Sequence, residues 1–148
     1  MKKCTLALGC FWKPEENFKN KYGIIETEVG YAGGKKSEVT YEEVCTGKTG
    51  HAEVVRLTFD EKIISFKKIL ELFFKMHDPT QKDMQYPDIG TQYRSEIFYE
   101  NEKQKQEASE ILDVFNKKLE GKIQTNISKI KNYCKAEEYH QKYIEKNR

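Results

Sequence analysis

The chain has 148 residues, which is enough for one domain with its own hydrophobic core. Its 26 Lys and Arg residues are interspersed with 24 Asp and Glu residues, a pattern that argues against a nucleic-acid-binding surface. No run of about 18 apolar residues occurs, which excludes a membrane-spanning helix. We therefore expect a single domain over residues 1–148, with no nucleic-acid or membrane partner.

The start of the chain resembles the opening of a secretory leader, but its apolar part is short and soon reaches charged residues. We therefore expect no cleaved leader. The cysteines show neither a CxxC pair nor regular spacing and stand at Cys4, Cys10, Cys45 and Cys134. This arrangement argues against a disulfide scaffold and against structural zinc. Free thiols without a leader fit a reducing compartment, and we expect the cytoplasm.

Three strands and a helix are predicted in the first part of the chain. Residues 3–9 form an apolar run that is typical of a buried strand, and residues 14–21 begin with the Pro and acidic residues of a helix's first turn. Residues 24–31 predict a second strand, which an Ala-Gly-Gly turn follows. Residues 52–59 alternate and are rich in Val, Leu and Phe, so they predict a third strand.

Two helices are predicted farther along by apolar residues at helical spacing. The two stripes are Phe66, Ile69, Leu70, Phe73 and Phe74, and then Ala108, Ile111, Leu112, Phe115 and Leu119. Between them a long stretch at 78–91 is punctuated by Pro and Gly, and a short strand follows at 95–99. Loops of that length in a compact domain tend to be functional. Residues 123–130 predict a last strand, and residues 136–146 a charged terminal helix.

The predicted order of elements is β-α-β-β-α-β-α-β. It favours an α+β fold in which helices pack on one sheet. We expect a single-domain, two-layer α/β sandwich with a ferredoxin-like core and a mixed or antiparallel sheet.

The run Gly9-Cys10-Phe11-Trp12 joins the first predicted strand to the first predicted helix. A cysteine there would face the unpaired N–H groups of the helix, whose partial positive charge favours the thiolate. The two aromatic residues could form an apolar pocket for a small substrate. The alternative is a buried core, because a free cysteine commonly packs as a small hydrophobic residue. These four residues alone leave both interpretations open.

Polar residues gather in two loops, at 41–53 and 88–95. Glu53 stands out because it begins an otherwise apolar strand. If its side chain points inward, burial raises its pKa and keeps it protonated as a proton donor. If the strand alternates strictly, Glu53 lies on the solvent face instead. Tyr41 and Tyr93 are equally open, because most tyrosines in a chain with nine of them are half-buried packing residues.

Three histidines invite a hydrolase interpretation, with Cys10 as nucleophile and a histidine as base. They are His51, His77 and His140. Nothing in their spacing distinguishes a catalytic base from a histidine in a loop or at a helix end.

Six motifs along the chain resemble the A-type peptide methionine sulfoxide reductases. They are Gly-Cys-Phe-Trp-Lys-Pro-Glu at 9–15, Val-Gly-Tyr-Ala-Gly-Gly at 29–34, Tyr-Glu-Glu-Val-Cys-Thr-Gly-Lys-Thr-Gly-His-Ala-Glu at 41–53, Asp-Pro-Thr at 78–80, Asp-Ile-Gly-Thr-Gln-Tyr-Arg-Ser at 88–95 and Ala-Glu-Glu-Tyr-His-Gln at 136–141. They occur in the family's order and span nearly the whole chain. A Cys-His hydrolase and a non-catalytic methionine-binding module are the alternatives.

The resemblance implies a role for each matching residue. Cys10 matches the family's nucleophile, and Phe11 and Trp12 match the aromatic walls around the S-methyl group of the substrate. Glu53 matches the carboxyl group that stays protonated and hydrogen-bonds the sulfoxide oxygen. The remaining matches are Tyr41 and Tyr93, two phenols that share this contact, and Asp88, an acidic residue that organises the site and its water. A sulfoxide carrying a small methyl group needs such an apolar slot with convergent donors.

The implied reaction is the thiol-dependent reduction of methionine S-sulfoxide, free or in proteins, to methionine. Cys10 attacks the sulfoxide sulfur while Glu53 protonates the oxygen, and Cys10 becomes a sulfenic acid. The family needs no metal or organic cofactor. Thioredoxin, or glutaredoxin with glutathione, would serve as reductant, and we expect a monomer.

The chain departs from the family pattern in the cysteines that regenerate the nucleophile. Many relatives carry resolving cysteines in a tail after the Tyr-His-Gln motif, whereas this chain ends at Arg148. Cys134 is the leading internal candidate, and the alternative is a one-cysteine enzyme reduced by an external thiol. We expect Cys45 to be a packing residue and Cys4 to point into the sheet. Tyr86 also departs from the family pattern, because it stands where a glycine is common.

Overall fold

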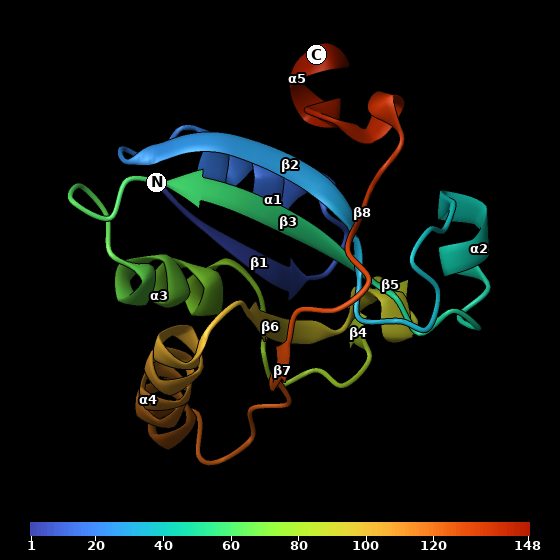
Figure 1. The fold of residues 1–148 in the computed structure, drawn as a ribbon. Coiled ribbons are helices and arrows are strands. Elements are labelled where there is room, and N and C mark those ends of the chain that lie inside the picture. The colour runs from blue at the N-terminus through green and yellow to red at the C-terminus, as the bar shows by residue number, and fades with distance from the viewer.

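The computed structural model describes residues 1–148 and is built around one six-stranded sheet (Figure 1). Its strands are ordered β7-β6-β1-β3-β2-β8, and a separate two-stranded hairpin pairs β4 with β5. The strands are β1 (Lys2–Leu8), β2 (Ile24–Ala32), β3 (Ala52–Phe59), β4 (Met84–Gln85), β5 (Asp88–Ile89), β6 (Ser95–Tyr99), β7 (Asn126–Lys129) and β8 (Cys134–Lys135). The α-helices are α1 (Trp12–Lys19), α2 (Tyr41–Cys45), α3 (Phe66–Met76), α4 (Glu102–Lys118) and α5 (Tyr143–Lys146).

The four central strands confirm the predicted ferredoxin-like core. In chain order β1, α1, β2, β3, α3 and β6 form a β-α-β-β-α-β unit, and all neighbouring pairs among its strands are antiparallel. The sheet is mixed because β7 joins the edge of β6 in parallel. At the opposite edge, β8 pairs antiparallel with β2.

The hydrophobic clusters on the two faces of the sheet differ in size. Alternate residues of β1, namely Cys4, Leu6 and Leu8, belong to a core of 21 buried residues that also holds apolar side chains of α1 and α3. The opposite face carries a smaller cluster of five, made mostly of alanine and valine and covered by Ile130 and Tyr133. Small side chains leave room there for the chain that follows β7 to cross close to the sheet.

Helices α3 and α4 follow the predicted apolar stripes and lie side by side (Figure 1). The Phe74 and Phe115 rings stack between them with centroids 5.1 Å apart. Each helix begins at a side-chain cap: Ser65 accepts the Lys68 N–H, and Asn101 accepts the Gln104 N–H. The Asn101 cap explains why α4 begins before the predicted stripe.

The predicted terminal helix at 136–146 is wrong. Residues Glu138–His140 form one 3₁₀ turn, and only Tyr143–Lys146 are α-helical. The side-chain amide of Gln141 accepts the Val29 N–H and donates to the Val29 carbonyl, both at 2.9 Å, and therefore holds this segment against the edge of β2. Lys142 then adopts a left-handed backbone with φ of 49°, which interrupts any helix.

Three shorter segments also differ from prediction. The last strand at 123–130 is confined to Asn126–Lys129. The polar loop at 41–53 begins with the short helix α2, which starts at a capping box between Thr40 and Glu43. The long stretch at 78–91 contains the β4–β5 hairpin. No helix in the structure has both the length and the apolar character needed to span a bilayer.

Candidate active site

The turn between β1 and α1 presents Cys10 at the end of the sheet. Gly9 has a φ of +94°, and a Cβ atom there would lie 2.8 Å from the Gln85 side chain. Only glycine fits this backbone without strain or a clash. The turn therefore brings the β4–β5 hairpin directly against the residue before Cys10.

Glu53 points inward, as the family resemblance implied. The alternative, in which Glu53 lies on the solvent face of an alternating strand, is wrong. It shares a face of β3 with Val55 and Leu57 and is 1% exposed. The Phe11 N–H donates a hydrogen bond of 3.2 Å to its Oε1 atom, whereas Oε2 has no partner. One carboxyl oxygen is therefore buried and free to contact a ligand.

The surroundings of Glu53 keep its carboxyl group protonated. Burial raises the pKa of Glu53 to about 8, and the negative charge of Asp88 adds to this effect. The hydrogen bond from the Phe11 N–H acts in the opposite direction but is too weak to cancel burial. At neutral pH Glu53 is mostly a neutral acid, which can donate a proton.

The predicted thiolate at Cys10 is wrong for the unliganded protein. Burial, with smaller contributions from the nearby carboxyl groups of Glu53 and Asp88, raises the pKa of the Cys10 thiol to about 12. The backbone N–H of Trp12 lowers the pKa, as expected at a helix start, but this single N–H does not offset burial. Cys10 and Glu53 are thus both protonated at neutral pH.

Two tyrosines and Asp88 surround this pair. Burial and the negative charges of Glu53, Asp88 and Cys10 raise the pKa of Tyr93 to about 12. The pKa of Tyr41 is raised too, by burial first, with Tyr93 and Glu53 among the smaller causes. Asp88 and Cys10 line one hollow of about 360 Å³ between α1 and the β4–β5 hairpin. Cys10 and Asp88 therefore share one hollow, and Glu53, Tyr41 and Tyr93 lie near enough to affect one another's pKa.

Phe11 and Trp12 form an aromatic wall beside Cys10. Phe11 is fully buried, and its ring contacts Tyr31 with centroids 5.7 Å apart. Trp12 is half-buried, and Tyr143 stacks on it with centroids 3.8 Å apart and an angle of 8° between the planes. The Trp12 indole N–H donates to Nδ1 of His140 at 3.0 Å.

No histidine hydrogen-bonds Cys10, so the hydrolase interpretation has no base. His140 is bonded to Trp12, and burial lowers its pKa. His77 contacts the Phe73 carbonyl and the Ser95 hydroxyl, and burial lowers its pKa to about 4. His51 is buried beside Gly34. Sequence reasoning weighed His140 only as a catalytic base and missed its contact with the aromatic wall.

The other cysteines occupy three different environments. Cys4 is completely buried in the core, as predicted, and burial raises its pKa. Cys45 is exposed at the end of α2, so its predicted packing role is wrong. Cys134 is half-buried on β8, where its thiol donates to the Val39 carbonyl at 3.6 Å.

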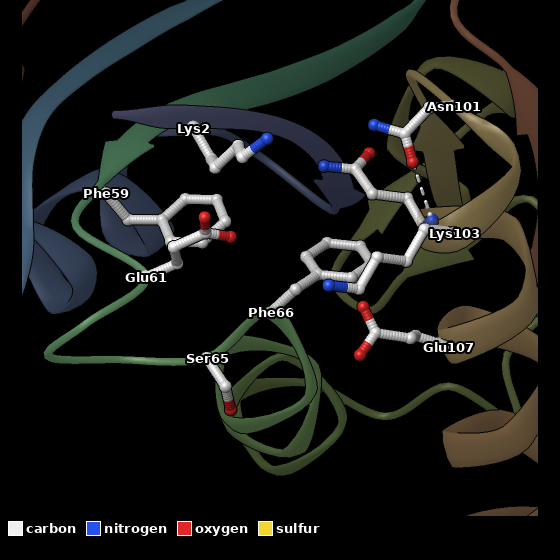
Figure 2. Close-up of a pocket in the computed structure, with 9 residues that line it drawn as sticks. Lys2, Phe59, Glu61, Ser65, Phe66, Asn101, Lys103 and Glu107 are labelled. Carbon is white, nitrogen blue, oxygen red and sulfur yellow. Dashed lines mark hydrogen bonds between the residues drawn. The ribbon is translucent and has the colours of Figure 1, made fainter.

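A second hollow of about 370 Å³ lies where α3 and α4 begin, away from Cys10 (Figure 2). Its lining is mostly polar, and two of its amide side chains are used within the fold. Asn101 accepts the Gln104 N–H, and the Gln104 side chain donates to the Lys3 carbonyl. No group of three or more His, Cys, Asp or Glu residues is arranged to hold a metal ion anywhere in the structure.

Comparisons with known proteins agree with this geometry. The family model described as peptide methionine sulfoxide reductase matches residues 2–148. A peptide methionine sulfoxide reductase MsrA of Pelagibacter ubique is 57% identical over 146 residues, which cover 99% of both chains. Another from Methanosarcina acetivorans is 48% identical and is matched over 99% of this chain and 79% of its own length.

Solved structures of the same family superpose closely. Reduced Mxr1 from Saccharomyces cerevisiae has a TM-score of 0.95 at 40% identity, covering 99% of this chain and 85% of that chain. Mxr1 in complex with Trx2 has a TM-score of 0.69 at 28% identity, covering 96% of this chain and 84% of that chain. The motifs, the ferredoxin-like core and these matches together show that the chain belongs to the peptide methionine sulfoxide reductases, oxidoreductases that reduce methionine sulfoxide at the expense of thiols.

Proposed function

We propose that this chain reduces the S epimer of methionine sulfoxide with Cys10 as the nucleophile and Glu53 as the proton donor. The observation that carries this proposal is the buried, protonated Glu53 carboxyl group beside the Cys10 thiol. Its Oε2 atom has no hydrogen-bond partner. A sulfoxide oxygen placed there would accept a hydrogen bond from an acid that water cannot reach. Phe11 and Trp12 would hold the methyl group, and Tyr41, Tyr93 and Asp88 would complete the polar side of the site.

The proton inventory of the site suits this reaction. As the Cys10 sulfur bonds to the sulfoxide sulfur, Glu53 gives its proton to the oxygen and then takes up the thiol proton. The bond between the two sulfur atoms and the bond between the substrate sulfur and oxygen then break, and the hydroxyl group is transferred to the Cys10 sulfur. The products are methionine and a Cys10 sulfenic acid. Because the thiol proton has a nearby acceptor, the raised pKa of Cys10 does not prevent attack. Tyr41 and Tyr93 would stabilise charge on the oxygen.

Two external thiols would return Cys10 to its starting state. A dithiol such as thioredoxin reduces the sulfenic acid to a thiol, releases water and leaves as a disulfide. Mxr1 forms a complex with Trx2, which supports thioredoxin here, and glutaredoxin with glutathione is the alternative.

Four free cysteines fit the reducing environment of the cytoplasm. We take residues 1–148 to act as one domain, because one core of 21 residues joins both predicted stripes to the sheet.

The nucleophile is tested by a single-turnover assay with methionine S-sulfoxide. Cys10→Ser should abolish methionine formation, because a hydroxyl is far less nucleophilic than a thiol. Cys134→Ser is the matched control and should keep the wild-type single-turnover rate of methionine formation, because a resolving thiol acts only after methionine has formed. Activity retained by Cys10→Ser would overturn the proposal.

Cys134 remains a candidate for resolving the sulfenic acid. The register of the sheet shows how far Cys134 lies from the strand that carries Glu53. Tyr31 pairs with Glu53 on one side and with Cys134 on the other. Two strand spacings, ~10 Å, therefore separate the Cα atoms of Glu53 and Cys134. A disulfide between Cys10 and Cys134 needs their Cα atoms within about 7 Å, and β2 lies between β8 and the strand that carries Glu53.

Counting thiols after one equivalent of substrate distinguishes the two schemes. Loss of two thiols per chain, reverting to one in Cys134→Ser, would support Cys134 as the resolving residue. Loss of a single thiol in the wild type, trapped by a sulfenic-acid reagent, would support direct reduction by an external thiol.

A further inference from the structure

His140 lies at the centre of the aromatic cluster beside Cys10. It is 1% exposed, and three rings of the candidate site surround it: Tyr41, Phe11 and Trp12, with centroids 4.6, 5.1 and 5.7 Å away. Tyr139 packs against it from outside at 4.1 Å. One histidine thus touches the wall of the methyl pocket and one of the two phenols.

The hydrogen bond between Trp12 and His140 defines how the imidazole is used. The indole N–H can only donate, so Nδ1 of His140 must be the unprotonated acceptor, and the ring carries its hydrogen on Nε2. Burial lowers the pKa of His140 and keeps this neutral form at pH 7. Nε2 has no partner and is enclosed. His140 therefore reaches neither Cys10 nor solvent by a hydrogen bond.

Trp12 is held by two residues of the same short segment. Tyr143 covers one face of the indole by stacking, and His140 holds the indole N–H in the plane of the ring. Rotation of the indole about its Cβ–Cγ bond would break both contacts and leave a half-buried N–H without a partner. Only the face away from Tyr143 remains for a ligand.

We propose that His140 is a positioning residue, which orients the Trp12 indole through Nδ1 so that its free face receives the methyl group of the sulfoxide. The inference rests on the proposed function for the identity of the substrate, but not for the hydrogen bond. His140 touches no reacting atom. Its effect should therefore appear in substrate binding and in the environment of Trp12.

A matched pair of variants isolates the acceptor from the packing of the ring. Asn and Leu side chains have the same number of heavy atoms and both branch at Cγ, but only Asn carries an oxygen on Cγ where Nδ1 stood. We expect His140→Leu to lower kcat/KM for methionine S-sulfoxide about tenfold, mainly through KM, since an unpaired polar group typically costs this much. His140→Asn should stay within about threefold of wild type.

Trp12 is the sole tryptophan of the chain, so its fluorescence reports the same contact without any activity. His140→Leu should shift the emission and expose Trp12 to quenching, and His140→Asn should resemble wild type. Equal kcat/KM values for the two variants, or an unchanged emission in His140→Leu, would overturn the inference. A wild type that fails to reduce the sulfoxide, with the expected fluorescence difference intact, would instead overturn the proposed function.

Trp12→Phe tests the same hydrogen bond while His140 stays in place, so it keeps the inference falsifiable if His140→Leu folds poorly, and an unchanged KM in this variant would overturn it. Trp12→Phe keeps an aromatic wall but removes the indole N–H, and alone it should raise KM about as much as His140→Leu. In that background His140→Asn and His140→Leu should have equal kcat/KM values. A persisting difference between them would show that His140 acts through a partner other than Trp12.

Discussion

The candidate site is held by two regions of different construction. The catalytic floor comprises Cys10, on the turn that follows β1, and Glu53, near the start of β3, so both residues are anchored by long strands of the central sheet. The C-terminal strap, residues 136–146, contains one 3₁₀ turn and one four-residue helix. The residues proposed to react lie on the floor, whereas the strap contributes contacts that hold Trp12 in place.

The two regions also differ in what stabilises them. The floor is fixed by sheet pairing and by the buried core behind it. The strap is fixed by individual side chains: Gln141 bonds to Val29, Glu15 accepts the Lys142 N–H at 2.7 Å, and Glu137 accepts the Tyr41 N–H at 2.8 Å. Single substitutions should therefore affect chemistry on the floor and stability or binding on the strap.

The largest effect should come from the floor, at Glu53. Glu53→Ala removes the donor to the sulfoxide oxygen and should lower kcat/KM by about 10²–10³, as loss of an oxyanion donor typically does. Glu53→Gln keeps a hydrogen-bond donor of the same size and should retain partial activity. The measurement is the steady-state rate with methionine S-sulfoxide. Equal rates for the two variants would contradict the donor role and blur the distinction between floor and strap.

The same residue should make the stability of the floor depend on pH. Folding raises the pKa of Glu53 from 4.5 to about 8, so between these values the folded chain binds more protons than the unfolded chain. The free energy of unfolding should therefore fall as pH rises from about 5 to 8, by up to ~1.4 kcal/mol per pH unit from this group. Urea titrations should show a shallower decline for Glu53→Gln. Parallel pH profiles of the two proteins would rule out this coupling.

A smaller effect is expected on the strap, at Gln141. Gln141→Leu leaves the Val29 N–H without a partner, whereas the Val29 carbonyl keeps the Ala136 N–H, and should cost about 2 kcal/mol of unfolding free energy. Gln106→Leu on the exposed face of α4 is the matched control, and it should change stability by less than about 0.5 kcal/mol. Urea unfolding measures both. A Gln141→Leu variant as stable as the control would mean that the strap is not held by this amide.

The floor was largely predictable from the sequence, and the strap was not. An apolar run located β1, and periodicity located β3 and the stripes of α3 and α4, because these elements repeat the same burial every two or four residues. The predicted helix at 136–146 failed because the hydrogen bonds of Gln141 to a strand more than 100 residues away decide its backbone. The inward direction of Glu53 followed from the family resemblance, since the alternating pattern by itself favoured the solvent face.

The protonation state of Cys10 was predicted wrongly for a related reason. A helix start is visible in sequence, but the burial and the two carboxyl groups that outweigh it come from β3 and β5. The contact between Trp12 and His140 was equally hidden, because the two residues are 128 positions apart. Local sequence patterns thus predicted the helices and strands. Contacts between residues far apart in the chain determine the protonation of Cys10 and the contacts of Trp12.

The Gln141 amide also bears on how the folded chain avoids self-association. β2 is nine residues long, and β8 covers its outer edge with only two paired residues, at Gly30 and Tyr31. By occupying both backbone groups of Val29, a single side chain acts as an additional strand residue and extends this cover. An uncovered strand edge is a template on which a second chain can pair. We therefore expect Gln141, which holds the strap against β2, also to hinder a second chain from pairing with the edge of β2.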